Sequence, residues 1–344
     1  MKLNNIKNLI DQKPHKYNFE YECGMADYLN LPPIERWITY IATDADPKEG
    51  YFPEETINFA SEAKKKYRTL ADCDGSGKSG NNDLIHEIYN ALFAWENEGD
   101  NFEKEGDDFR KVGAFKCDFG GDTMNSLFFP LIDHAGVEIK QIPKEPVMGR
   151  YSKNHLMDYF VQKETRDRFL DVLQNTSGLI DYINSYHTIG NFTLVPAGFN
   201  AYRGGKLRDY WDESLKYLKK NGFKKAQFEG GADFTKYVNY FFLWDYIGKN
   251  GEPIDLNPKS GNCSFLQTTT KFIYRRGVFM IAMLNLHKSL GEKGYAELRE
   301  NVFCKSDGVY SSYYDVIDLL KKQTDNPKAK MILENCLNEI SAID

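Results

Sequence analysis

Residues 186–211 read Tyr-His-Thr-Ile-Gly-Asn-Phe-Thr-Leu-Val-Pro-Ala-Gly-Phe-Asn-Ala-Tyr-Arg-Gly-Gly-Lys-Leu-Arg-Asp-Tyr-Trp, and this central stretch decides the predicted fold. Its apolar, β-branched run at 192–195 is typical of a strand, and the proline that follows ends it. Gly204-Gly205 then predicts a turn, and Asp209 is a suitable N-cap for the helix that follows. The sequence therefore predicts a strand-loop-helix unit within 187–220.

Apolar residues spaced three to four positions apart predict helices on both sides of the central stretch. The segments with this spacing are 34–41, 57–71, 84–95, 156–173, 179–183, 210–218, 234–247, 265–290, 309–320 and 329–340. The run 127–132 fits either a strand or a helix. The predicted fold class is therefore mainly α (α+β), a helical protein with a small β element.

The composition is that of a globular protein with a large core: the chain has 344 residues, 41% hydrophobic and 27% charged. Aromatic residues make up 14%, and we expect them to serve mainly core packing. Pro143 and Pro146 interrupt the helical patterns. We expect an N-terminal helical region, 1–145, and a C-terminal helical region, 146–344, that contains the central stretch, or else one continuous domain.

The charge pattern restricts the possible partners. A formal net charge of −6 argues against nucleic-acid binding over the whole surface but leaves room for a local basic patch. Segment 203–225 holds eight Lys or Arg against three Asp or Glu, and we expect any nucleic-acid affinity to depend on it. Arg275 and Arg276 fall inside a predicted apolar helix, where they either meet an anionic ligand or extend to solvent.

The location of the protein is predicted from what the sequence lacks. No stretch approaches ~20 uninterrupted apolar residues, and the N-terminus has no signal-peptide pattern, so we expect a cytoplasmic protein without a membrane span. The six cysteines show no metal-clamping spacing and are expected to be reduced.

Segment 72–83 is a weak candidate for a calcium loop. Asp72, Asp74, Ser76 and Asp83 occupy positions 1, 3, 5 and 12 of an EF-hand-like loop between two predicted helices. Position 12 is aspartate in place of the longer bidentate glutamate, and the sequence has no second loop to pair with it. The alternative is a polar helix connector. We predict that this loop does not bind calcium tightly.

Polar residues that can carry a function are dense in the central stretch. His187, Asn191 and Asn200 are candidates for catalysis, and the binding candidates are Arg203, Lys206, Arg208 and Asp209. Each has a structural alternative, because a histidine can be buried and bonded to backbone and asparagines can stabilise turns. The two arginines can also pair with Asp209 and Asp212 on a solvated surface, where ion pairs contribute little.

The string His187-Thr-Ile-Gly-Asn-Phe-Thr-Leu, with Asn200 following, resembles the Ile-Gly-Asn-Leu-Thr-Leu-Leu plus Asn core of an HNH-type nuclease domain. That domain lies at the C-terminus of Gmr-like modification-dependent restriction enzymes. The fuller string, with Arg203 and Asp209-Tyr210-Trp211, more closely resembles a bacterial family of unknown function built on the same His-Thr-Ile-Gly-Asn-Phe block. The resemblance covers the central stretch alone.

The resemblance implies a ββα-metal arrangement, in which a histidine activates water and a helix residue holds a divalent metal. Carried across, Asn191 would be the loop asparagine, Asn200 the metal-side residue, and His187 a histidine beside the block. The acid-His-Ile-x-Pro segment expected upstream is missing, and its nearest substitutes are Asp133-His134 and Asp122-Thr123.

Two kinds of function therefore stay open. One is a bacterial protein with a degenerate HNH-like core that binds nucleic acid in phage defence, or serves as a non-catalytic structural or interaction module. The other is a metal-dependent HNH-type nuclease.

Overall fold

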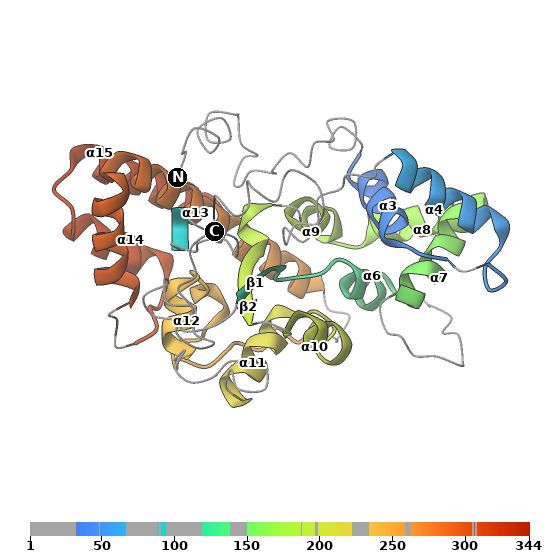
Figure 1. The fold of residues 1–344 in the computed structure, drawn as a ribbon, viewed down its shortest axis with the longest axis horizontal. Coiled ribbons are helices and arrows are strands. Elements are labelled where there is room, and N and C mark those ends of the chain that lie inside the picture. The colour runs from blue at the N-terminus through green and yellow to red at the C-terminus, as the bar shows by residue number, and fades with distance from the viewer. Residues whose placement is uncertain are drawn as a thin grey trace, which may run out of the picture.

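The structure is a computed structural model that describes residues 32–47, 49–66, 88, 91–93, 119–137, 150–186, 188–196, 199–221, 234–258, 263–304, 306 and 308–344. Over these ranges the fold is mainly α, as predicted, with one two-stranded antiparallel sheet. In Figure 1 the sheet lies near the centre, with helices on either side along the longest axis. None of the described helices combines the length and apolar character needed to cross a membrane.

Four helices gather at one end of the molecule, α3 (Pro33–Asp44), α4 (Glu54–Lys66), α7 (Arg150–Val161) and α8 (Lys163–Asn175) (Figure 1). The helix predicted over 34–41 is confirmed as α3, and the described part of the one predicted over 57–71 is confirmed as α4; α3 begins with proline and α4 with acidic residues, both of which suit a helix N-terminus. The single helix predicted over 156–173 is wrong. The backbone of the residue between α7 and α8 is extended, with φ −81° and ψ 119°, and this separates the two helices.

The open choice at 127–132 is settled in favour of a helix, α6 (Phe128–Ala135). It ends at Gly136, whose φ of 66° suits glycine. The short helix predicted before the central stretch is confirmed as α9 (Leu179–Tyr186). It leads towards a 3-10 turn, η1 (Ile189–Asn191), that directly precedes the predicted strand.

The predicted strand is β2 (Phe192–Pro196), and it pairs antiparallel with β1 (Phe119–Thr123). Asp122 lies opposite Thr193, and Thr123 lies opposite Phe192. β1 belongs to the predicted N-terminal region and β2 to the C-terminal region, so the two regions share this sheet.

The chain after β2 differs from the prediction. Gly204 and Gly205 form no turn but lie inside α10 (Phe199–Lys206), and the reversal comes later, at Arg208 and Asp209 with φ of 55° and 54°. Asp209 is not the residue before the next helix, since α11 (Trp211–Asn221) starts two positions later. Positive φ is costly for residues with a Cβ, so this turn needs support from its side-chain contacts.

A short helix, α12 (Phe234–Tyr240), and a 3-10 turn, η3 (Trp244–Tyr246), replace the single helix predicted over 234–247. The longest of the described helices, α13 (Cys263–Arg299), contacts α9 and η1, and it bends at Gly291, where φ is 73°. A π-helical segment, η5 (Glu300–Cys304), follows it.

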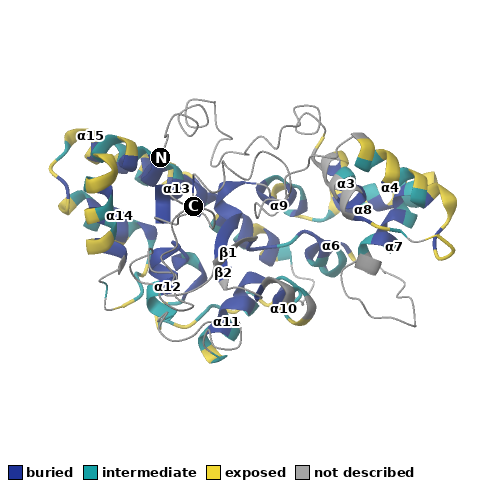
Figure 2. Cartoon of the chain, in the orientation of Figure 1, coloured by how far each residue is buried: buried dark blue, intermediate teal, exposed yellow. Residues whose placement is uncertain are grey.

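Two further predicted helices are confirmed at the C-terminal end, α14 (Tyr313–Lys322) and α15 (Pro327–Ser341). Ser312 and Asn326 cap their N-termini through side-chain oxygens. In Figure 2 β2 is dark blue, whereas α4 and α15 show yellow outer faces. Many of the aromatic rings lie in the buried core, as expected: Phe242, Trp244, Phe279, Phe303 and Tyr313 form one contiguous cluster.

Candidate functional site

Asn191, at the end of η1, is fully buried and bonded to backbone. Its Oδ1 accepts hydrogen bonds from the backbone N–H of Asn125 (3.1 Å) and from Asn125 Nδ2 (3.3 Å). Its Nδ2 donates to the carbonyls of Asn125 and Tyr186, both at 3.0 Å. Asn191 therefore links α9 to the segment that follows β1. This arrangement fits the alternative in which the asparagine stabilises a turn through hydrogen bonds to backbone.

Arg276 of α13 also supports this turn. Its side chain is 1% exposed, and Nη1 donates to the carbonyls of Gly190 (2.9 Å) and Phe192 (2.5 Å). Its Nε donates to the carbonyl of Phe241 at 3.0 Å. The guanidinium is thus enclosed among backbone carbonyls and does not extend to solvent, and it joins the central stretch to the chain after α12.

The neighbouring arginine, Arg275, instead pairs with the largely buried carboxylate of Asp245, with Nη1 3.2 Å from Oδ2. Burial raises the pKa of Asp245 from 3.8 to about 6, although the Arg275 charge opposes this rise. The folded protein therefore holds this proton more tightly than the unfolded chain does. The stability that this carboxyl contributes is fully present below pH 3.8 and is lost as the pH rises through about 6.

We predict that Asp245→Asn changes the pH dependence of folding stability. The difference between a pKa of 3.8 and one of about 6 corresponds to roughly 3 kcal/mol of folding stability, which the parent should lose relative to the variant between pH 3 and pH 7. Urea unfolding of both proteins across this range measures the difference. Parallel stability curves would show that Asp245 titrates normally in the folded protein.

Arg203 of α10 is also 1% exposed and spans the space between α10 and the end of β1. Its Nη2 donates to the carbonyls of Thr123 (2.6 Å) and Met124 (3.0 Å), and its Nε lies 3.3 Å from Asp209 Oδ1. Its guanidinium carbon lies 5.4 Å from the centre of the Trp211 ring. The pairing with Asp209 is confirmed, but it is buried on the arginine side and is not a solvated surface pair.

This position bears on the metal that the resemblance implies. The resemblance implies a ββα unit with a metal held by a residue of the helix; in this chain α6 to α9 lie between β1 and β2, and α10 follows β2. Here the Arg203 guanidinium lies at the junction between the end of β1 and α10, where it donates hydrogen bonds to the carbonyl oxygens of Thr123 and Met124. A fixed positive charge opposes a divalent cation at this distance. The described residues of the junction therefore do not fit a divalent metal, while the side chain of Asn200 and all of His187 lie outside the description.

Arg208, at the turn, joins α10 and α11 to α6. Its Nη2 forms an ion pair with Asp133 Oδ1, and its guanidinium carbon lies 4.7 Å from the centre of the Phe129 ring. The Tyr210 hydroxyl donates to Asp133 Oδ2 at 2.6 Å. Burial and this hydrogen bond raise the pKa of Tyr210 far above its usual value, so the phenol stays neutral. These contacts stabilise the positive-φ turn.

His134 follows Asp133 on α6 and is 8% exposed. Its ring stacks on Phe265 of α13, with centroids 5.3 Å apart and planes within 6°. A strand over 127–132 beside β2 would have allowed it to face Asn200, but the run is helical and the described neighbour of β2 is β1. The structure therefore does not place His134 on the sheet, where the resemblance expects the general base.

Four of the six described cations of the predicted basic segment pair with carboxylates. Lys216 Nζ lies 3.7, 3.0 and 2.9 Å from carboxylate oxygens of Asp212, Glu213 and Asp255. These carboxylates are close enough together to hold a cation, but the lysine ammonium already lies among them, so they indicate no metal site. Lys219 pairs with Glu252 at 2.8 Å.

Two tyrosines outside the predicted site residues, the exposed Tyr202 on α10 and the half-buried Tyr217 on α11, lie side by side. The rings of Tyr202 and Tyr217 lie 4.7 Å apart, and both rest on the buried ring of Phe199 at 6.3 and 5.9 Å. Tyr202 is 39% exposed, one of three large hydrophobic residues exposed among those described. A hydrogen bond with Tyr202 raises the pKa of Tyr217, so the Tyr217 phenol is neutral at pH 7.

Lys206 and Lys220 flank this pair and are exposed. Lys206 follows Tyr202 by four residues and Lys220 follows Tyr217 by three, so each lysine shares a helix face with its tyrosine. Within the described part of the chain, neither lysine forms an ion pair. We call Tyr202, Lys206, Tyr217 and Lys220 the tyrosine platform. The spacing between tyrosine and lysine on each helix can be read from the sequence and could have indicated these residues. The packing of α10 against α11, which brings the two tyrosines together, could not be read from it.

The calcium-loop residues Asp72, Asp74, Ser76 and Asp83 lie outside the described residues, so the prediction about that loop stays a prediction. Comparison of the chain with protein-family models, with curated proteins and with solved structures finds no significant match.

Proposed function

We propose that this chain binds single-stranded nucleic acid on the tyrosine platform. The observation that carries the proposal is the exposed Tyr202 ring, which lies tilted beside the ring of Tyr217 with the two centroids 4.7 Å apart. Apolar side chains that gather on a surface and are rimmed by polar residues can mark an interaction site. An unpaired base has an apolar face that can cover such a ring, and stacking a base on an aromatic side chain contributes about 1–3 kcal/mol.

The charges of the platform suit a nucleic-acid backbone. Lys206 and Lys220 lie beside the rings and are exposed, so phosphates can approach them as the bases stack. The remaining described cations of the segment are held by carboxylates, as for Arg203, Arg208 and Lys216. We therefore infer a short contact of few phosphates, in keeping with the negative charge of the whole chain.

The central stretch then serves as the support of the platform. Arg203 holds α10 to β1, and Arg208 holds the turn between α10 and α11 to α6, so the two helices that carry the tyrosines are fixed. On this view the HNH-like block is a degenerate nuclease core whose scaffold presents a binding surface. The resemblance to a restriction-enzyme domain favours a role for that binding in defence against phage DNA or RNA.

We predict that Tyr202→Ala/Tyr217→Ala weakens binding of fluorescein-labelled oligo(dT) or oligo(U) at least about 10-fold, because one lost stacking contact alone accounts for that factor. Fluorescence anisotropy at low salt measures it. The matched control is Tyr51→Ala, which removes a tyrosine that is 69% exposed but lies between α3 and α4. That control should bind like the parent.

The lysines are tested through the salt dependence. Two phosphate contacts predict a slope of log K against log salt of about −1.4 for a single strand, and Lys206→Gln/Lys220→Gln should bring it close to zero. Parent protein that binds neither oligonucleotide, or that prefers duplex of the same length, contradicts the proposal. Oligonucleotide cleavage in Mg²⁺ or Mn²⁺ that Asn200→Ala abolishes would instead support the nuclease alternative.

A further inference from the structure

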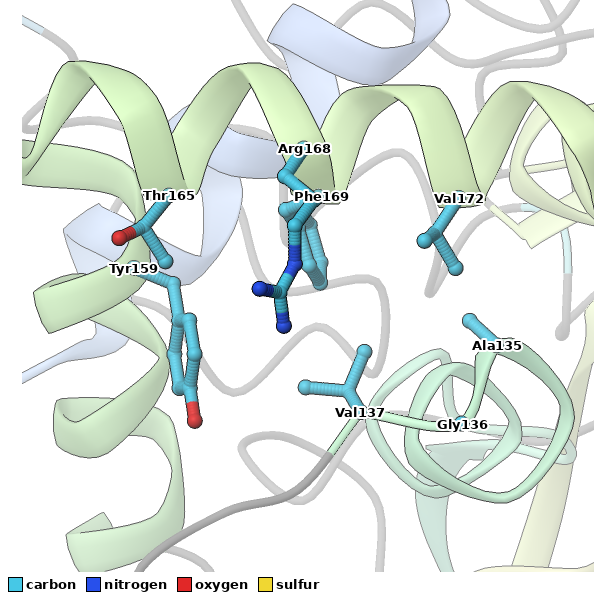
Figure 3. A pocket seen from close by; sticks show the side chains of 8 residues that line it. All are labelled: Ala135, Gly136, Val137, Tyr159, Thr165, Arg168, Phe169 and Val172. Carbon is cyan, nitrogen blue, oxygen red and sulfur yellow. The ribbon is translucent and has the colours of Figure 1, made fainter.

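A second surface feature lies between α6, α7 and α8, apart from the tyrosine platform. It is a partly open hollow of about 380 Å³ (Figure 3). Eight residues line it: Ala135, Gly136, Val137, Tyr159, Thr165, Arg168, Phe169 and Val172. Its volume lies at the lower end of the range of small-molecule sites, about 300–1,000 Å³.

One cation points into this hollow. Arg168 extends from α8, and Figure 3 shows its guanidinium between Tyr159 and Val137. Glu164 and Asp171 lie one helical turn away on either side, yet Arg168 forms no ion pair within the described ranges of the chain. A guanidinium presents paired N–H donors that match the two oxygens of a carboxylate. The side chain is therefore placed to meet an anion inside the hollow.

The other groups of the hollow divide into hydroxyls and apolar walls. The Tyr159 hydroxyl lies on the α7 side, and Thr165 donates its hydroxyl hydrogen to Gln162 Oε1 at 3.5 Å. Phe169 is buried and held by edge-to-face contact with Phe160, with centroids 4.9 Å apart. The apolar walls are therefore fixed rather than free to collapse into the space.

We propose that this hollow binds a small carboxylic acid with an apolar body, such as an aromatic or branched aliphatic acid. The carboxylate pairs with Arg168, and the apolar body lies against Phe169, Val172 and Val137. Arg168 supplies one positive charge to the hollow, and Glu164 and Asp171 on the same helix add negative charge nearby. The hollow therefore suits a ligand with one negative charge better than a ligand with two. The site therefore selects a monocarboxylate over a phosphate monoester dianion.

The test uses benzoate and isovalerate as probes, with phenyl phosphate as the dianion and benzyl alcohol as the neutral match. Binding to the full chain is measured at constant ionic strength by ligand-observed NMR titration. We expect both carboxylates to bind more tightly than phenyl phosphate and benzyl alcohol. Failure of the parent protein to bind either carboxylate would overturn the proposal.

Three variants locate the site. Arg168→Gln should weaken benzoate binding about 10-fold or more through loss of a charge-assisted pair, whereas Arg166→Gln, on the same helix but outside the lining, should change it less than about 2-fold. Val172→Trp should fill the hollow and remove binding while Arg168 stays in place. Circular dichroism melts of each variant identify any that fails to fold. Equal effects of the two arginine variants, or unchanged binding to folded Val172→Trp, would contradict the assignment.

Discussion

Replacing Arg276 with methionine is expected to lower the free energy of unfolding by about 3–5 kcal/mol. Methionine keeps much of the apolar stem but leaves the carbonyls of Gly190, Phe192 and Phe241 buried without their donor. Each such carbonyl costs about 1–3 kcal/mol, and a small protein has only about 5–15 kcal/mol of stability in total. The measurement is urea unfolding followed by circular dichroism and by tryptophan fluorescence.

The matched control for Arg276 is Lys288→Met, at an exposed position of the same helix, which should change stability by less than about 0.5 kcal/mol. Arg276→Lys should fall between the two, because one ammonium does not reproduce the spread of a guanidinium over three carbonyls. If Arg276→Met were as stable as the parent, the arginine would not hold the central stretch in place.

The second large effect is expected from Asn191→Ala, at about 3 kcal/mol. Alanine removes four hydrogen bonds and leaves the backbone groups of Asn125 and the carbonyl of Tyr186 buried without partners. Asn125→Ala should cost less, about 2 kcal/mol, since its own side chain donates to Asn191 and to the Tyr246 hydroxyl only.

A double-mutant cycle distinguishes this shared network from two independent sites. The double variant Asn125→Ala/Asn191→Ala should be more stable than the sum of the single effects predicts, by about 1 kcal/mol, because both changes remove the same contact. Asn175→Ala is the control, because that exposed asparagine bonds only to Asp171 within its own helix. Strict additivity of the two buried changes would show that Asn191 and Asn125 do not act together.

The helices and the strand could be predicted because their signals are local. Apolar spacing placed α3, α9, α14 and α15, and the β-branched run placed β2. The errors came where tertiary contacts override local propensity. Two adjacent glycines suggested a turn, but Arg203 and Phe199, on the same segment, anchor that segment as a helix, α10.

The candidate site was harder to predict because a buried charge has no local signature. Arg203 and Arg276 are fully enclosed only because backbone carbonyls from distant parts of the chain converge on them. Sequence reasoning places such residues on the surface, where charged residues usually lie. Similarly, Tyr202 and Tyr217 become a pair only once α10 and α11 fold back on each other.

The most direct measurement of the central claim is photocrosslinking of the full chain to a single-stranded oligonucleotide that contains 5-iodouracil, followed by peptide mapping. The proposed function predicts adducts on Tyr202 or Tyr217 that disappear in Tyr202→Ala/Tyr217→Ala and persist in Tyr51→Ala. Adducts that map to other elements, or that are unchanged in the double variant, would contradict it.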